Sequence, residues 1–124
     1  MLREPQVAAA GPGAPRPAVR LPATKAIVRE TWRLDPEISW YGPGFYGNRT
    51  ACGVVVLQRE TIGVAHRTLP CGTRVTFRYN GKTVVTRVID RGPYVAGRIF
   101  DLTRGACAAI NHCFTGGGVY YRIG

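Results

Sequence analysis

Residues 74–93 read RVTFRYNGKTVVTRVIDRGP, and this stretch decides the fold class. Apolar and polar residues alternate over residues 74–79, and a second run rich in β-branched residues covers residues 82–89. Between the two runs, Asn80-Gly81 is a strong two-residue signal for a tight turn, because both residues readily adopt the positive φ that such turns need. The stretch therefore predicts a β-hairpin whose second strand leads into Asp90.

The sequence around this hairpin also has the composition of a small β-protein. Sixteen glycines and nine prolines among 124 residues favour short strands joined by turns over a helical bundle. We expect further strands near residues 39–42, 63–67 and 118–122.

One helix is predicted over residues 103–111. Thr103 is its expected N-cap, because a threonine side chain can accept a hydrogen bond from a free amide of the first helical turn. The spacing of the apolar residues predicts that Ala106, Ala109 and Ile110 lie on the side of the helix that faces the core.

Two regions of the chain differ in composition. Residues 1–37 are rich in Pro, Ala and Arg, which cannot bury a core, so we expect a largely disordered linker there. A short strand around residues 25–32 is the alternative for its last part. Residues 38–124 form the predicted compact domain. The chain has no apolar run long enough to span a bilayer, and we expect any export signal to lie outside this sequence.

The predicted domain carries four cysteines: Cys52, Cys71, Cys107 and Cys113. An even number without a Cys-x-x-Cys pair is more typical of two disulfides than of a metal site, so no metal or other cofactor is expected. Four cysteines allow three pairings, and spacing alone does not choose among them. We favour Cys52 with Cys71 and Cys107 with Cys113, which predicts an oxidising environment outside the cytoplasm.

The chain is strongly basic, with a net charge of +10 that arises from 17 basic and 7 acidic residues. Such a surface attracts polyanions: nucleic acid, anionic lipid or phosphate-bearing wall polymers. The basic residues are scattered singly and form no nucleic-acid-binding motif, which argues against nucleic acid as the partner. A solvated basic surface without a partner is the alternative.

Carboxylates are scarce after residue 38, where only Glu60, Asp90 and Asp101 occur. Asp90 stands at a strand end beside a Gly-Pro turn, where a rigid scaffold can present it to a groove, although such a residue can also simply cap the turn. Asp101 lies beside the predicted helix start, where a negative charge is favourable in any case. His66, in a predicted strand, is a third candidate, with a purely structural role as the alternative.

Aromatic residues gather in one short segment. Trp40, Tyr41, Phe45 and Tyr46 lie within seven residues and are interleaved with glycine and proline. Some of them belong to the core, but the glycine-rich spacing indicates a loop that exposes one or two flat rings. Such rings can stack on the faces of sugars.

Three segments of the chain resemble, in the same order, the rare-lipoprotein-A-like domains of bacterial cell-wall proteins. They read SWYGPGFYG with TACG (residues 39–47 and 50–53), AHRTLPCGTRV (residues 65–75), and IDRGPY with GR and DLT (residues 89–94, 97–98 and 101–103). The two cysteines in these segments are placed as in actinobacterial members. The resemblance implies an all-β fold, a six-stranded double-psi β-barrel related to barwin and expansins, which the hairpin and one short helix near the C-terminus fit.

The resemblance also implies a lytic transglycosylase that acts on the glycan strands of peptidoglycan. In that mechanism one carboxyl group protonates the glycosidic oxygen and then, as a base, helps the muramic C6 hydroxyl to close onto the anomeric carbon. The matching residue is Asp90, with His66 lining the groove and Asp101 nearby helping Asp90 to stay protonated. We expect the glycan to be bound by Trp40, Tyr41, Tyr46, Arg91 and Tyr94.

The sequence departs from the family pattern at one position. The pattern has Glu directly after an Ala-x-Gly segment, whereas Val54 follows here, and Glu60 can replace that Glu only if its loop folds back. Two other functions therefore stay open: a non-catalytic, expansin-like module that binds wall glycan, and a secreted barwin-like domain that binds a polyanion or another partner. In each case we expect a monomer, secreted or associated with the cell wall.

Overall fold

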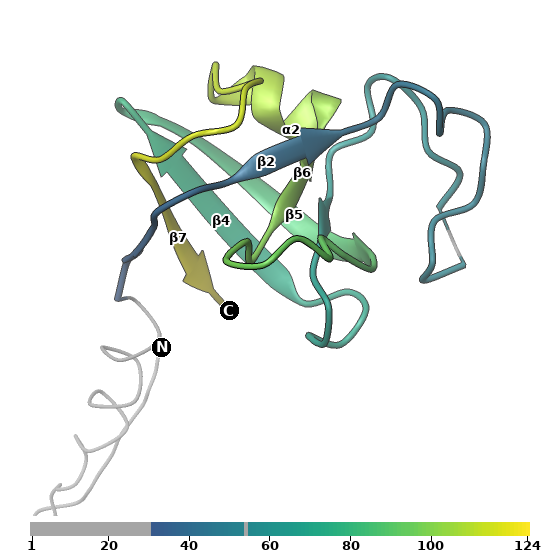
Figure 1. The fold of residues 1–124 in the computed structure, drawn as a ribbon, viewed down its shortest axis with the longest axis horizontal. Helices are drawn as coiled ribbons and strands as arrows, with labels where there is room; N and C mark the ends of the chain where they lie inside the picture. The colour runs from purple at the N-terminus through teal and green to yellow at the C-terminus, as the bar shows by residue number, and fades with distance from the viewer. Residues whose placement is uncertain (1–30, 54) are drawn as a thin grey trace, which may run out of the picture. The chain divides into compact units, whose positions relative to one another are not determined.

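The fold is known from a computed structural model, which describes residues 31–53 and 55–124 (Figure 1). These residues form one short helix and seven strands. In chain order the elements are β1 (Arg33–Asp35), β2 (Ser39–Tyr41), β3 (Val64–Ala65), β4 (Arg74–Tyr79), β5 (Lys82–Asp90), β6 (Asp101–Thr103), α2 (Arg104–Ala109) and β7 (Val119–Ile123).

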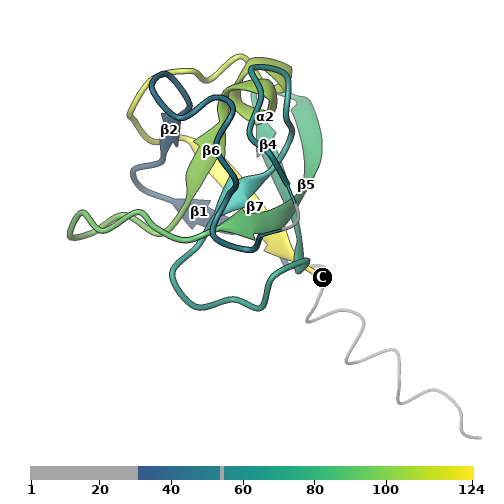
Figure 2. The ribbon, with the colours of Figure 1, turned by 90° about the vertical axis from the view of Figure 1, so that its right-hand side faces the viewer.

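All seven strands belong to one sheet with the order β1-β7-β4-β5-β3-β6-β2. One half, β1-β7-β4-β5, is antiparallel throughout. The other half is mixed, because β3 pairs parallel with β5 and antiparallel with β6, and β2 pairs parallel with β6. The long strand β5 joins the two halves, and Figures 1 and 2 show the sheet curling round on itself into a barrel-like form.

The predicted hairpin is confirmed. Strands β4 and β5 pair antiparallel up to Tyr79 and Lys82, and Asn80 and Gly81 between them have positive φ values of 48° and 80°. Val84 and Val88 of β5 are buried, whereas Val85 is exposed, so one side of the hairpin faces the core. The strands predicted near residues 39–42, 63–67 and 118–122 are also present, as β2, β3 and β7.

Two strands were not predicted, and both are only three residues long. Strand β1 pairs with β7, so the ordered domain begins upstream of the predicted boundary at residue 38, and the sheet has seven described strands where six were expected. Strand β6 lies between β3 and β2. The greater part of the predicted linker, residues 1–30, and with it most of the possible strand at residues 25–32, lies outside the described residues.

The helix is confirmed with one correction. Thr103 is the N-cap, and its side-chain oxygen accepts a hydrogen bond from the amide of Ala106. Ala106 and Ile110 are buried as predicted, but Ala109 is exposed and Cys107 faces the core in its place. The helix has only six residues, so an error of one residue in its phase exchanges the buried and exposed positions.

Both predicted disulfides are present, Cys52–Cys71 and Cys107–Cys113. The first links the loop after β2 to the loop before β4, and the second closes the segment at the end of α2. Among the described residues, none of the helices is long and apolar enough to cross a membrane.

Buried apolar side chains from both halves of the sheet and from α2 form a single core. Its largest members include Phe77, Phe100, Ile38, Leu102 and Ile110, all of them fully buried. Helix α2 closely approaches the loop between β2 and β3. A Cβ atom on Gly105 would lie 2.6 Å from the carbonyl oxygens of Glu60 and Thr61 in that loop. Only glycine fits there.

This close approach predicts the sign of a substitution. In an open helix, Gly→Ala stabilises by about 1 kcal/mol through helix propensity. Gly105→Ala should instead lower the free energy of unfolding by about 1–3 kcal/mol, because the new methyl group meets backbone atoms that cannot give way. Urea unfolding of Gly105→Ala and of Ala108→Gly, which measures propensity at an exposed position of α2, checks this. A stabilised Gly105→Ala variant would contradict the contact.

Candidate active site

A surface cavity of about 580 Å³ lies where β2, β5 and β6 come together. Its floor and walls are built from these strands, from the loop after β2 and from the turn after β5. The lining residues that the following argument uses are Ser39, Trp40, Tyr41, Phe45, Asp90, Arg91, Tyr94, Arg98 and Asp101.

Two aspartates reach this cavity at the same level of the sheet. Ala65 of β3 is the register partner of Asp90 on β5 and also of Asp101 on β6. Because neighbouring strands lie about 4.8 Å apart, the backbones of the two aspartates are about 10 Å apart, one on each side of β3. The cavity therefore contains two carboxyl groups at its centre.

The carboxylate of Asp90 is held by three hydrogen-bond donors. Its Oδ1 accepts bonds from the amides of Ala51 (2.8 Å) and Arg91 (2.9 Å), and its Oδ2 accepts a bond from the hydroxyl of Tyr41 (2.9 Å). Asp90 thus caps its own turn, as one interpretation of the sequence expected, and also lines the cavity, as the other expected. Both of its oxygens act as acceptors.

Tyr41 lines the cavity and also contacts Asp90. Its hydroxyl donates to the Asp90 carboxylate, and its expected role in binding substrate stays a prediction. Burial, followed by the charge of Asp90 and the hydrogen bond to it, raises the pKa of Tyr41 far above its ordinary value. The hydroxyl therefore keeps its proton and remains a donor throughout the physiological pH range.

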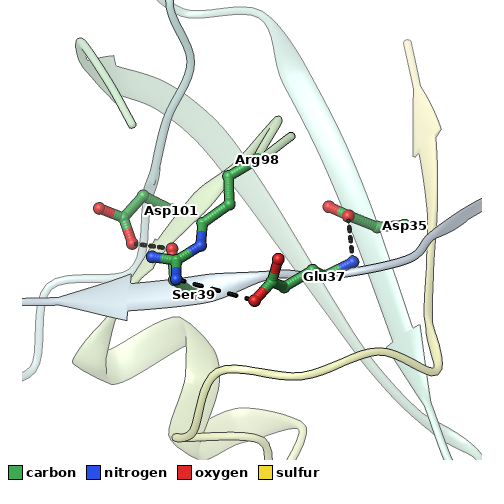
Figure 3. A network of polar contacts seen from close by, with 5 residues as sticks. All are labelled: Asp35, Glu37, Ser39, Arg98 and Asp101. Atoms are coloured by element: carbon green, nitrogen blue, oxygen red, sulfur yellow. Dashed lines mark hydrogen bonds and ion pairs between the residues drawn. The ribbon is translucent and has the colours of Figure 1, made fainter. Parts of the chain in front are cut away.

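Asp101 lies in a different environment. It is half-buried in β6, and its Oδ1 accepts one hydrogen bond, from the Ser39 hydroxyl at 3.0 Å (Figure 3). Burial raises the pKa of Asp101 and nearby Asp90 adds to this, while the Ser39 bond and the charge of Arg98 act in the opposite direction. Of the two aspartates, Asp101 is the one whose surroundings favour a bound proton.

Arg98 connects Asp101 to the start of β2. Its guanidinium lies between Asp101 and Glu37 in Figure 3 and is 3.7 Å from the Glu37 carboxylate. Glu37 in turn donates its amide to buried Asp35, which is not among the residues that line the cavity. Ser39 was not predicted as a site residue, because the pairing of β2 with β6 that brings it to Asp101 is not visible in the sequence. Arg98 was not predicted as one either, although it lies only three residues before Asp101.

His66 is not brought into the cavity. Its Nδ1 accepts bonds from the amides of Thr68 (3.1 Å) and Leu69 (3.0 Å), and its ring lies 5.1 Å from that of Phe100. Burial, then the charges of Arg67 and Arg91, lowers the pKa of His66, so the ring is neutral near pH 7 and carries its proton on Nε2. The histidine holds a turn together here, and its catalytic role stays a prediction.

Arg91 also has a structural task. Its guanidinium donates to the carbonyl oxygens of His66 (3.0 Å) and Leu69 (2.8 Å) and not to Asp90. It thereby ties the loop after β3 to the turn after β5, while part of the residue still lines the cavity. Arg91 contacts the adjacent carboxylate through its backbone amide, while its guanidinium is directed to the two carbonyl oxygens.

Most of the predicted aromatic residues line the cavity. Trp40 is half-buried against the core, whereas Phe45 and Tyr94 are 55% and 76% exposed. Tyr46 does not line the cavity, because its ring covers the backbone of Gly42. Glu60 is exposed and also lies outside the lining, so it does not take the place of the Glu that the family pattern has at Val54. The described residues contain no cluster that could hold a metal ion.

Comparisons with known proteins agree on the family. The family described as lytic transglycolase, of the double-psi β-barrel type, matches residues 37–120. The chain is 46% identical over 109 residues to a probable endolytic peptidoglycan transglycosylase RlpA of Synechocystis, covering 79% of this chain and 34% of that protein. It is 45% identical over 95 residues to the endolytic peptidoglycan transglycosylase RlpA of Campylobacter jejuni, with coverages of 75% and 34%.

The chain thus spans about a third of the length of these two relatives. Among solved structures, it is similar to the Streptomyces papain inhibitor, with a TM-score of 0.60, 22% identity, and coverage of 76% of this chain and 94% of that one. At this identity the likeness concerns the fold alone, and it supports an all-β double-psi barrel. The motifs, the curled sheet and the match over residues 37–120 together show that the chain belongs to the lytic transglycolase family of double-psi β-barrel domains.

Proposed function

We propose that this domain is a lytic transglycosylase that cleaves the glycan strands of peptidoglycan in the cell wall, outside the cytoplasm. The observation that carries the proposal is the pair of aspartates at one cavity, of which Asp101 has a pKa raised by burial and Asp90 is oriented by three hydrogen-bond donors. The relatives from Synechocystis and Campylobacter jejuni are named as peptidoglycan transglycosylases, which supports this substrate class. Two disulfides agree with an oxidising environment.

Asp101 is the better proton donor of the two. A general acid has to hold its proton near the working pH, and burial moves the pKa of Asp101 in that direction. Its Oδ1 accepts a hydrogen bond from Ser39, so a proton on Oδ2 can reach a substrate. This modifies the expectation from the sequence, in which Asp90 alone was acid and base.

Asp90 is suited to act as a fixed negative charge. Three donors orient its carboxylate, so its position changes little when charge develops beside it. Cleavage of a glycosidic bond passes through a state with positive charge at the anomeric carbon, which a preorganised carboxylate stabilises. Asp90 therefore contributes electrostatic stabilisation, and Tyr41 is its positioning residue.

The proposed reaction balances with these two groups. Asp101 gives its proton to the glycosidic oxygen as the bond from that oxygen to C1 breaks, and the leaving sugar departs as an alcohol. The Asp101 carboxylate then takes the proton of the muramic C6 hydroxyl as that oxygen bonds to C1. The product is a 1,6-anhydro end, and Asp101 is protonated again. The exposed rings of Phe45 and Tyr94 supply surfaces on which sugar rings can stack.

A second function is supported by a specific observation. Val54 stands where the family pattern has Glu, and Asp90 is bonded to two backbone amides as a turn-capping residue would be. Both features suit an expansin-like module that binds wall glycan without cleaving it. Digestion of sacculi separates the two functions, since only a transglycosylase releases soluble fragments with anhydro-muramic ends.

Removal of the proposed acid should abolish cleavage but not binding. Asp101→Asn is expected to lower the rate of anhydro-muramic product formation by about a hundredfold or more, the usual contribution of a general acid. Mass spectrometry of soluble products from sacculi measures this, and cosedimentation with sacculi should be retained. A wild-type domain that sediments with sacculi yet releases no product would instead establish the binding module.

The pH profile identifies which aspartate is the acid. Because Asp101 must be protonated, the rate should fall as the pH rises through its pKa. Ser39→Ala removes a hydrogen bond that stabilises the ionised form, so the pKa of Asp101 rises and the falling limb moves to higher pH. The test is to measure the rate between pH 4 and 8, a range chosen to cover the part of the profile in which the rate falls. A limb that stays in place in Ser39→Ala would point to another acid.

The hydroxyl of Tyr41 can be tested with a matched control. Tyr41→Phe keeps the ring but removes the donor to Asp90, and it should lower kcat about tenfold with little change in KM, because hydrogen bonds to charged groups contribute about 1.5–3 kcal/mol. Tyr46→Phe makes the same chemical change outside the cavity lining and should leave kcat unaltered. Equal effects of the two substitutions would exclude the positioning role.

A further inference from the structure

The antiparallel half of the sheet presents a basic surface that the active site does not use. Side chains alternate along each strand, and the strand registers show which positions share a side. Val75 and Phe77 of β4 point into the core. The residues of β4 that alternate with these two point outward, and so do the residues of β5 and β7 paired with them. We call this outer side the arginine face, and its charged and aromatic members are Trp32, Arg74, Arg78, Arg87, Tyr120 and Arg122.

Two arginines of this face stand directly opposite each other. Arg74 on β4 and Arg87 on β5 are register partners, and both are exposed. Each guanidinium donates to a backbone carbonyl oxygen, Arg74 to Gly124 (3.3 Å) and Arg87 to Gly72 (3.1 Å). Like charges placed opposite each other across two strands repel, so a bound anion would relieve this pair.

A second pair of arginines shares one aromatic ring. The guanidinium carbons of Arg78 and Arg122 lie 4.2 Å and 4.7 Å from the centre of the Trp32 ring. The ring stabilises both cations and limits their motion. Four guanidinium groups are therefore held on one side of three neighbouring strands, and this lowers the entropy that a ligand would lose on binding them.

Side-chain carboxylates of the described residues form no ion pair with three arginines of the face, Arg74, Arg78 and Arg87. Within residues 31–53 and 55–124, Arg98 forms an ion pair with Glu37, away from this face. Asp35 alternates to the inner side of β1 and is fully buried. The face also shares no residue with the lining of the cavity, so occupation of one surface leaves the other open.

We propose that the arginine face binds a flexible, linear wall polymer that carries phosphate in each repeating unit. The guanidinium fork matches the oxygens of a phosphate group. Arg74 and Arg78 are four residues apart on one strand, about 13 Å, and strands are about 4.8 Å apart, so the charges form a grid that successive phosphates of one chain can follow. The choice of a wall polymer rests on the proposed function, which brings the domain to the wall.

The face fits a flexible chain better than a nucleic-acid duplex. Duplex recognition commonly places a helix or a β-ribbon in a groove. Here the arginines lie on the broad side of a sheet, and among the described residues the one helix, α2, packs with Ala106 and Ile110 into the core on the opposite side. Duplex DNA is therefore the competing ligand that the experiment has to exclude.

The test measures binding of purified poly(glycerol phosphate) chains as a function of NaCl concentration. Arg78→Gln/Arg87→Gln removes one guanidinium from each pair and should weaken binding at least tenfold at 0.1 M salt. The slope of log Kd against log salt concentration should fall by about two, one for each lost phosphate contact. Arg78→Lys/Arg87→Lys should keep the slope but lose affinity, since the charge remains and the fork is lost.

The matched control removes the same charge elsewhere. Arg33→Gln/Arg59→Gln changes two exposed arginines that lie off the face and should alter Kd less than twofold. Asp101→Asn should bind the polymer as the wild type does, so a failure of the enzymatic proposal leaves this test intact. Equal losses in the control and face variants, or equal affinity of the wild type for duplex DNA of the same charge, would overturn the proposal.

Discussion

The pairing of β3 with two different partners is the constraint on which the site depends. Strand β3 has only two residues, yet it hydrogen-bonds in parallel to β5 and antiparallel to β6. Ala65 thereby lies between Asp90 and Asp101, and its small side chain leaves space at this level for a cavity. Two carboxyl groups that are eleven residues apart in the sequence become neighbours across a single strand. The chemistry of the site follows from this arrangement.

The two aspartates differ because their surroundings differ. Asp90 accepts hydrogen bonds from two backbone amides and a tyrosine hydroxyl. Asp101 accepts one from a serine hydroxyl, and the arginine near it is also paired with Glu37. Burial favours the neutral form of Asp101, whereas the three donors fix the orientation of the Asp90 carboxyl group. Arg91 and His66, which the motif placed beside the reaction, instead fasten the loops that supply these donors.

Strand β5 relates the two surfaces of the domain. Its end carries Asp90 into the cavity, while Arg87, three residues earlier, points to the outer side of the antiparallel half. Arg87 lies in the part of β5 that pairs with β4, and Asp90 in the part that pairs with β3, so one element can serve both surfaces without interference. A polymer held on the arginine face would keep the cavity close to the wall while leaving it free to engage a glycan strand.

Local signals in the sequence were sufficient for the hairpin at residues 74–89, the Thr103 cap and the β-rich class, because turn chemistry and side-chain alternation act over a few residues. The favoured disulfide pairs and the family were also identified correctly. Strands β1 and β6 were missed because three residues carry no periodicity, and Ser39 because only the β2–β6 pairing brings it to Asp101. Tertiary structure alone decided which carboxyl group is buried and which is surrounded by donors, since protonation depends on neighbours that are distant along the chain.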